Sequence, residues 1–207
     1  MMRTMSKATK TRDLQRTRGE ILNAAFAEIF TNGFQGVSID KIIARTGMTK
    51  GAFFHQFSTK MELGYALVDE VLRDLIKTRW IDPIAEFENP LDGIIAQMNK
   101  LIGKAPNDLL RMGCPLNNLV QEMTNVDETF AQKLSEVIDY WIDGVDTALK
   151  RGIANGHIKD SIKTRDAAIY IVMFHEGMYG FLKTKPDHKV FLSLFKAFKQ
   201  QLDTYRA

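Results

Sequence analysis

Several features that would indicate other classes of protein are scarce in this sequence. It has a single cysteine, Cys114, which excludes an internal disulfide framework and a cysteine-rich zinc site and is compatible with a reducing compartment. Its 5 prolines and 14 glycines are too few for a turn-rich β architecture. The longest apolar run, Ala167 to Phe174, is far too short to span a bilayer. The polar, basic start has no apolar stretch behind it, so we expect no secretory signal, no membrane contact and a cytoplasmic location.

The sequence contains enough apolar residues to form a core, and its charged residues are unevenly distributed. Hydrophobic residues make up 45% of the chain, which is not a disordered composition. Residues 1–60 hold ten basic and four acidic side chains, whereas residues 61–207 hold eighteen basic and twenty-one acidic ones. A basic N-terminal segment followed by a mildly acidic remainder suggests that residues 1–60 bind a polyanion, although a solvated basic tail would give the same asymmetry.

Apolar residues recur at helical spacing along nearly the whole chain, and no alternating strand pattern of useful length is present. The pattern therefore predicts an all-α fold. A polar tail over residues 1–12 is expected to be disordered, and the stretch between Pro106 and Pro115 is expected to be irregular. The predicted helices cover residues 13–32, 39–46, 50–57, 59–79, 90–104, 116–123, 128–155, 164–183 and 187–205.

The first sixty residues have the order of a helix-turn-helix: a helix, a short helix, a tight glycine turn and another short helix. Ser38 and Thr49 are good N-caps for the two short helices, because a hydroxyl oxygen can accept a hydrogen bond from an unpaired backbone N–H. Gly47 lies between these helices in the segment Thr46-Gly47-Met48. In a helix-turn-helix the helix after the turn is presented to the major groove of DNA.

Residues 16–63 resemble the TetR family of bacterial transcriptional regulators. The resemblance is carried by the ordered strings RGEILNAA (residues 18–25), FTNGF (30–34), SIDKIIARTGMTKGAFFHQF (38–57) and KMEL (60–63). It covers about a quarter of the chain; the remainder matches only in length and helicity. The resemblance implies a helix-turn-helix domain at residues 13–60 and a larger helical domain for ligand binding and dimerisation at residues 61–207.

The resemblance also implies which residues meet double-stranded DNA. The family places the third helix in the major groove, and Lys50 could donate there to guanine or to a phosphate. The family commonly has a phosphate-bonding tyrosine where this chain has Phe54, so the location is carried over but the hydrogen bond is not. The DNA-contact residues expected from the resemblance are Ser38, Thr49, Lys50, Gly51, Ala52, Phe54, His55 and Lys60.

For the C-terminal domain the resemblance implies a homodimer, built largely by the last two long helices, and a pocket for a small-molecule effector. The chain would then be a repressor that leaves a near-palindromic operator when the effector binds. No cofactor and no metal are expected. The candidate ligand-binding residues are Met98, Leu101, Cys114, Asn117, Trp141, Met173 and His175, although such side chains at helical spacing also occur as plain core.

Cys114 allows two interpretations. The segment Gly113-Cys114-Pro115 resembles one found in some TetR-type regulators, a few of which respond to electrophiles or oxidants. At the N-terminus of the helix that follows, the helix dipole would lower the pKa of the thiol and make Cys114 reactive. The alternative is that Cys114 is a small buried hydrophobe.

Two other functions compete with that of a regulator. An enzyme is disfavoured, because His175-Glu176 begins like a zinc-protease motif but position 179 is Tyr rather than the second histidine. The chain also lacks a glycine-rich phosphate loop and a Gly-x-Ser-x-Gly elbow. The second alternative is an interaction module that no longer binds specific DNA. It is compatible with Phe54, which cannot make the phosphate hydrogen bond of the family's tyrosine.

Overall fold

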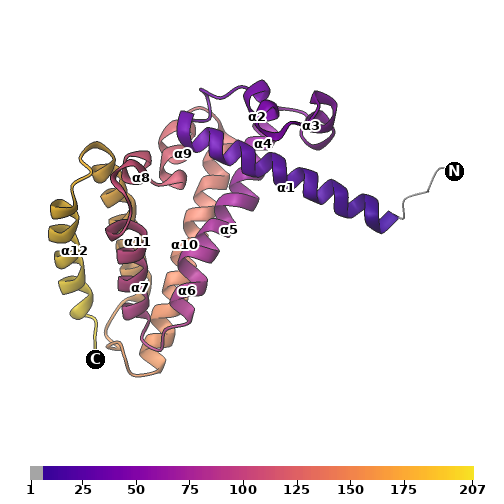
Figure 1. Cartoon of the computed structure of the whole chain (residues 1–207). Coiled ribbons are helices and arrows are strands. Elements are labelled where there is room, and N and C mark those ends of the chain that lie inside the picture. Colours follow the sequence, from indigo (N-terminus) through magenta and orange to yellow (C-terminus); the bar gives the residue numbers. More distant parts are fainter. Residues whose placement is uncertain (1–6) are drawn as a thin grey trace.

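The computed structural model describes the backbone of residues 7–207 and the side chains of residues 13–207. Figure 1 shows the first three helices at one end of the molecule and the longer helices of the C-terminal part side by side below them. Among the described residues no β-strand forms, and an isolated bridge pairs Ile158 with Arg206. The predicted all-α fold is confirmed.

The N-terminal end consists of α1 (Lys7–Asn32), α2 (Ile39–Thr46) and α3 (Lys50–Gln56). Helix α1 begins six residues before Asp13, so the predicted disordered tail is wrong for residues 7–12. Lysine, alanine and arginine in this stretch favour a helix by intrinsic propensity, even though no apolar period marks it. The other part of the predicted tail, residues 1–6, lies outside the described residues.

A continuous helical rod connects the N-terminal end to the rest of the molecule. It consists of α4 (Lys60–Ala66), a π-helical segment η1 (Leu67–Leu72), α5 (Arg73–Ile76), a second π-helical segment η2 (Lys77–Ile81) and α6 (Asp82–Ala85). The rod thus runs six residues past the predicted end at Arg79. Pro83 is tolerated because it lies in the first turn of α6, directly after a π-helical turn.

The remaining helices form the body of the C-terminal part. They are α7 (Pro90–Met98), continued by the π-helical segment η3 (Asn99–Gly103), α8 (Asn107–Met112), α9 (Pro115–Met123), α10 (Glu128–Ala154), α11 (Thr164–Thr184) and α12 (His188–Asp203). The prediction of an irregular stretch between Pro106 and Pro115 is wrong, because α8 forms there. Pro106 precedes its first turn and Gly113 ends it at a φ of 77°, so the two expected breakers bound a short helix.

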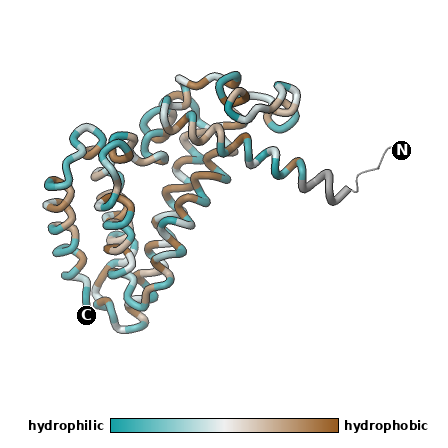
Figure 2. Tube along the Cα trace, in the orientation of Figure 1, coloured by the Kyte–Doolittle hydropathy of each residue, from teal (hydrophilic) through white to brown (hydrophobic). Residues whose placement is uncertain are grey.

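The core is continuous from the N-terminal helices to α12, and α10 lies at its centre. Helix α10 packs along α11 on one side and along the α4–α6 rod on the other, where the rings of Trp80 and Trp141 are 5.1 Å apart. Figure 2 shows hydrophobic residues along these central helices and hydrophilic residues at the connecting turns. In the described part of the chain, no helix has the length and apolar character that a membrane crossing requires.

Candidate nucleic-acid interface

Side-chain caps and one glycine fix the turn between α2 and α3. The Ser38 hydroxyl accepts a hydrogen bond from the Lys41 N–H at 3.3 Å, and the Thr49 hydroxyl accepts one from the Ala52 N–H at 3.2 Å. Gly47 ends α2 in the left-handed region, with φ of 66°, where a residue with a Cβ would be strained. The predicted caps and turn are therefore present, and they set α3 at an angle to α2.

One face of this helix pair is buried in the core. Ile42 of α2 and Phe53 of α3 are almost fully buried, as is Phe57, which directly follows α3. The guanidinium of Arg18 lies 4.5 Å from the centre of the Phe57 ring and bonds to Glu70 of the α4–α6 rod. Because these buried contacts fix α3 in place, its opposite face is held at the surface.

That surface carries most of the residues predicted to contact DNA. Ser38, Thr49, Lys50, Gly51, Phe54 and His55 are exposed, and Ala52 is half-buried. The Lys50 amine is 2.7 Å from Asp40 of α2, and both side chains are largely exposed. Because an exposed ion pair of this kind contributes only about 0–1 kcal/mol, Lys50 can exchange Asp40 for a phosphate or a base at low cost.

Lys60 stands apart from this group. It is half-buried at the start of α4; its amine donates to the backbone carbonyl of Gln35 at 3.4 Å and lies 4.7 Å from the centre of the Phe34 ring. Burial lowers the pKa of Lys60, although the nearby Glu122 carboxylate opposes this effect. The structure thus gives Lys60 a second role in supporting the link between α1 and α2.

Glu122 of α9 holds that same link from the C-terminal side. Its carboxylate accepts hydrogen bonds from the backbone N–H groups of Phe34 and Gln35, each at 2.8 Å. We refer to this pair of bonds as the Glu122 contact. Its partners are separated from it by 88 and 87 positions in the chain, so the contact joins α9 to the segment just before α2.

A cleft lies directly beside the Glu122 contact. It has a volume of about 410 Å³ and runs between the end of α1, the helix α9 and the last turns of α11. We call it the α1–α9 cleft. Its lining consists of Ile29, Phe30, Thr31, Gly33, Gly113, Cys114, Asn117, Asn118, Gln121, Glu122, Tyr179, Gly180 and Lys183.

The candidate ligand residues fall into three groups. Cys114 and Asn117 line the α1–α9 cleft. Met98, Trp141 and His175 are buried, Leu101 is partly buried, and none of the four is in the lining of the cleft. Met173 is 61% exposed on α11. The structure therefore does not bring the seven residues together into one pocket.

His175 is enclosed by aromatic rings. The rings of Trp80, Trp141 and Tyr179 lie 4.8–4.9 Å from it, each edge to face. The indole N–H of Trp141 has no hydrogen-bond partner among the described residues. A buried, unpartnered donor is costly, so a polar group that accepted a hydrogen bond from Trp141 would be stabilised there.

The structure does not support the prediction of a reactive Cys114 thiol. Cys114 is the N-cap of α9, and the backbone N–H groups of Asn117 and Leu116 do lower its pKa as expected. Burial and the Glu176 carboxylate outweigh them and raise the pKa of the Cys114 thiol well above its usual value. The side chain is 4% exposed, as in the alternative of a small buried hydrophobe.

Sequence reasoning missed Glu122, Glu176 and Tyr179. The Tyr179 hydroxyl donates to the Leu101 carbonyl at 3.1 Å, and burial raises the pKa of Tyr179 to about 12. Glu122 and Tyr179 bond residues far away in the chain, and Glu176 lies beside Cys114 as well as its neighbour His175; no local spacing indicates the distant partners.

Comparison with known proteins agrees with this arrangement of helices. The family described as "Bacterial regulatory proteins, tetR family" matches residues 21–67, and "Tetracyclin repressor-like, C-terminal domain" matches residues 90–197. The HTH-type transcriptional regulator TtgR of Pseudomonas putida is 25% identical over 190 residues, which cover 88% of this chain and 87% of TtgR.

Two further proteins extend the comparison. An uncharacterized HTH-type transcriptional regulator of Lactococcus lactis is 28% identical over 125 residues, 60% of this chain and just under two thirds (64%) of that protein. The crystal structure of a TetR-family regulator from Cytophaga hutchinsonii superposes with a TM-score of 0.83 at 18% identity, covering 99% of each chain. At this identity the likeness shows the fold alone.

Proposed function

The chain belongs to the TetR family of helix-turn-helix transcriptional regulators, and from this premise we propose that it is a repressor that binds a near-palindromic operator as a homodimer. A small-molecule effector would release it. The family is one of regulators and not of enzymes, so the enzyme alternative is set aside. We keep residues 13–60 as the DNA-binding domain and residues 61–207 as the ligand-binding and dimerisation domain.

The observation that carries the proposal is the exposed N-terminal end of α3. Thr49, Lys50 and Gly51 are exposed there, and a Cβ on Gly51 would meet nothing closer than the Thr49 hydroxyl oxygen, at 3.9 Å. An open end with small residues and one lysine allows the backbone to approach base edges and phosphates closely. Phe54, which is 48% exposed, adds an apolar group suited to a thymine methyl or a sugar.

An unpartnered apolar face supports the homodimer. Ile169, Met173 and Phe181 of α11 are exposed, and so is Leu192 of α12. The three α11 residues recur at helical spacing together with Gly177 and Gly180, beside which a Cβ would meet no atom within 4 Å. Such a face suits a second copy of the same surface. A two-fold dimer would set two α3 helices about one duplex turn apart, which is why the operator is expected to be near-palindromic.

The α1–α9 cleft supports an effector site next to the DNA-binding domain. Its lining joins apolar side chains of α1 to polar ones of α9 and α11, and it includes Cys114 and Asn117. A ligand there would touch Glu122, whose carboxylate holds the link before α2. The buried thiol gives no support to the electrophile version of the effector, so we favour a reversibly bound small molecule.

Release would follow from a population shift between two conformations of the dimer. The α4–α6 rod and the Glu122 contact are two of the physical connections between the C-terminal domain and the DNA-binding domain. A ligand acts only if it binds one conformation better than the other. The conformation favoured by the effector would place the two α3 helices at a separation that no longer fits both half-sites.

The proposal is tested by selecting bound duplexes from a random DNA pool. Wild type is compared with the double variant Lys50→Ala, Lys60→Ala and with the matched control Lys100→Ala, Lys104→Ala, which removes two exposed lysines from the C-terminal domain. We expect wild type and the control to enrich one near-palindromic consensus and the Lys50, Lys60 variant to enrich none. Absence of enrichment by wild type at every salt concentration would favour the interaction module instead.

A further inference from the structure

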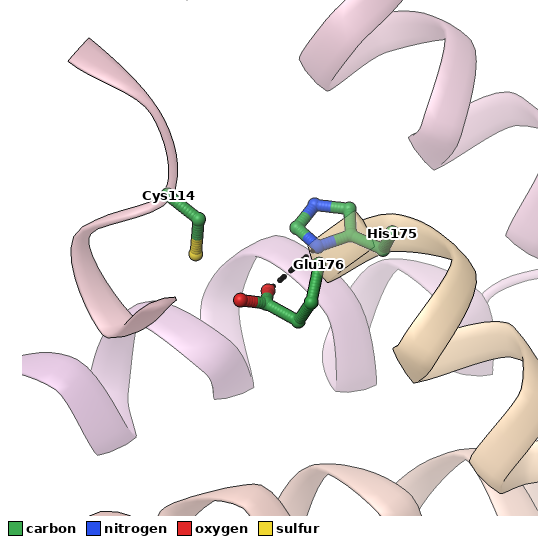
Figure 3. Close-up of side chains that lie close together, drawn as sticks. All are labelled: Cys114, His175 and Glu176. Atoms are coloured by element: carbon green, nitrogen blue, oxygen red, sulfur yellow. Dashed lines mark hydrogen bonds and ion pairs between the residues drawn. The ribbon is translucent and has the colours of Figure 1, made fainter. Parts of the chain in front are cut away.

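Three side chains of metal-ligating types converge where the start of α9 meets α11. Cys114 is the N-cap of α9, and His175 and Glu176 are consecutive in α11. One ligand atom from each, a sulfur, an imidazole nitrogen and a carboxylate oxygen, lie within 4.8 Å of one another. Figure 3 shows the thiol and the imidazole turned toward the carboxylate. We call these residues the Cys–His–Glu cluster.

The cluster is largely buried, and two of its members can carry a negative charge. Cys114 and His175 are 4% and 3% exposed, and Glu176 is half-buried. The imidazole Nδ1 of His175 is 2.9 Å from the Glu176 carboxylate. Among residues 13–207 no lysine or arginine forms a salt bridge with Glu176. A cation bound here would therefore meet no competing lysine or arginine at the carboxylate.

We propose that Cys114, His175 and Glu176 bind a divalent metal ion of the zinc class. One thiolate, one imidazole and one carboxylate are ligands that Zn²⁺ accepts together, whereas Mg²⁺ and Ca²⁺ prefer oxygen alone. On binding, the Cys114 S–H bond breaks and its proton passes to solvent, while the sulfur forms a bond to the metal. The two positive charges of the ion are then neutralised by the thiolate and the carboxylate.

The distances require only a small rearrangement of the cluster. Zinc lies about 2.3 Å from sulfur and about 2.0–2.2 Å from nitrogen or oxygen, which places the ligand atoms of a tetrahedral site roughly 3.3–3.7 Å apart. The ligand atoms that are now farthest apart, by at most 4.8 Å, must approach by about 1 Å, which requires small shifts of all three side chains. Three protein ligands leave a fourth position for water, and Cys114 borders the α1–α9 cleft, through which an ion can enter.

The first test is a titration of the purified, reduced, metal-free chain with Co²⁺, which replaces Zn²⁺ in tetrahedral sites and absorbs light. We expect one Co²⁺ per chain, a thiolate-to-cobalt charge-transfer band and the visible bands of four-coordinate cobalt. One equivalent of Zn²⁺ should abolish all of them. A spectrum of six-coordinate cobalt without the charge-transfer band would overturn the proposal.

Variants then assign the ligands. Cys114→Ser should abolish the charge-transfer band, and His175→Gln or Glu176→Gln should each weaken Co²⁺ binding by more than about 100-fold. The control is His188→Gln, an exposed histidine at the start of α12, which should bind as wild type does. Circular dichroism checks that each variant is folded. A band lost in Cys114→Ser but unchanged in both other variants would mean a lone thiol binding cobalt, and the site would be rejected.

A second measurement needs only the wild-type chain, so it does not depend on whether a variant folds. Because Cys114 is the single cysteine, any reaction with a thiol reagent reports on that residue. One equivalent of Zn²⁺ should slow the reaction at least tenfold, and a chelator should restore the original rate. An unchanged rate would contradict the proposal even if operator binding is normal, because the metal site does not depend on the DNA-binding function.

Discussion

The two ends of this molecule place their polar side chains in opposite environments. At the tip, Lys50, Gly51 and His55 of α3 are exposed. In the C-terminal domain, His175 and Tyr179 are buried among aromatic rings, and each has a hydrogen-bond or ion-pair partner. The tip can therefore be altered without unfolding the chain, whereas a change at buried residues such as His175 and Tyr179 affects stability and function together.

This difference teaches how function and folding are divided along the chain. A DNA-reading surface must remain exposed until DNA arrives, so its residues contribute little to the free energy of unfolding. A ligand site in a helical core is made of the same contacts that hold the helices together. The following predictions separate the two cases.

The largest effect is expected at the tip, for Gly51→Glu. The new side chain has open space around it and lies in the first turn of α3, where an acid suits the helix dipole, so the free energy of unfolding should stay within about 0.5 kcal/mol of wild type. Its carboxylate would face phosphates in both half-sites, and we expect operator affinity to fall by about 1000-fold. Fluorescence anisotropy and urea unfolding measure the two quantities. Gly51→Ala is the matched control and should bind with nearly wild-type affinity.

A smaller effect is expected for Met173→Glu on the exposed face of α11. The side chain is 61% exposed in one chain, so monomer folding should not suffer. In the proposed dimer the carboxylate would be buried without a partner, and we expect the dimer dissociation constant to rise by about 100-fold. Sedimentation equilibrium measures it. Val126→Glu, at an equally exposed position between α9 and α10, should dimerise normally; equal weakening by both variants would argue against the α11 face.

Glu122→Gln tests the Glu122 contact, which joins α9 to the segment between α1 and α2. An amide offers one acceptor oxygen to the two N–H groups of Phe34 and Gln35, so one bond to a charged acceptor is lost. We expect the free energy of unfolding to fall by about 1–2 kcal/mol, measured by urea unfolding. Glu86→Gln, an exposed acid at the end of α6, should change it by less than about 0.5 kcal/mol. If the two variants are equally stable, the Glu122 contact is unimportant.

The smallest effect is expected for Tyr179→Phe, through the pH dependence of stability. The hydroxyl bond to Leu101 is lost, which should cost about 1 kcal/mol at neutral pH. Burial raises the pKa of Tyr179 from 10.0 to about 12. The unfolded chain therefore releases this proton first, and the stabilisation present below pH 10 is lost as the pH rises toward 12. Urea unfolding of wild type between these pH values should show a steeper loss than unfolding of the variant.

The sequence predicted the tip in detail because that site is local. The caps Ser38 and Thr49, the turn at Gly47 and the exposed Lys50 lie within thirteen consecutive residues, and both caps and the turn act on neighbours within about one helical turn. The apolar pattern also predicted the long helices to within a few residues. The predicted helix bounds were wrong where no apolar spacing marks the helix: at the start of α1, in the rod beyond Arg79 and at the short helix α8.

The C-terminal site could not be predicted in the same way, because its members come from different elements. Cys114 meets Glu176 across 62 positions in the sequence, and the pKa of its thiol is raised by burial first and by this neighbour second, which outweigh the backbone N–H groups at the start of α9. Met173, chosen as a pocket residue for its type, lies on the surface. Residue type alone does not tell a core position from a pocket or a dimer face.

The measurement that tests the central claim most directly uses the selected operator and a variant of it in which about five base pairs, roughly half a duplex turn, are inserted between the half-sites. Binding of the wild-type chain to both duplexes is titrated at one salt concentration. If a dimer reads the two half-sites with its α3 helices, the insertion turns one half-site to the far side of the duplex, and affinity should fall by at least about 100-fold. Equal affinity for the two duplexes would contradict a dimeric reader.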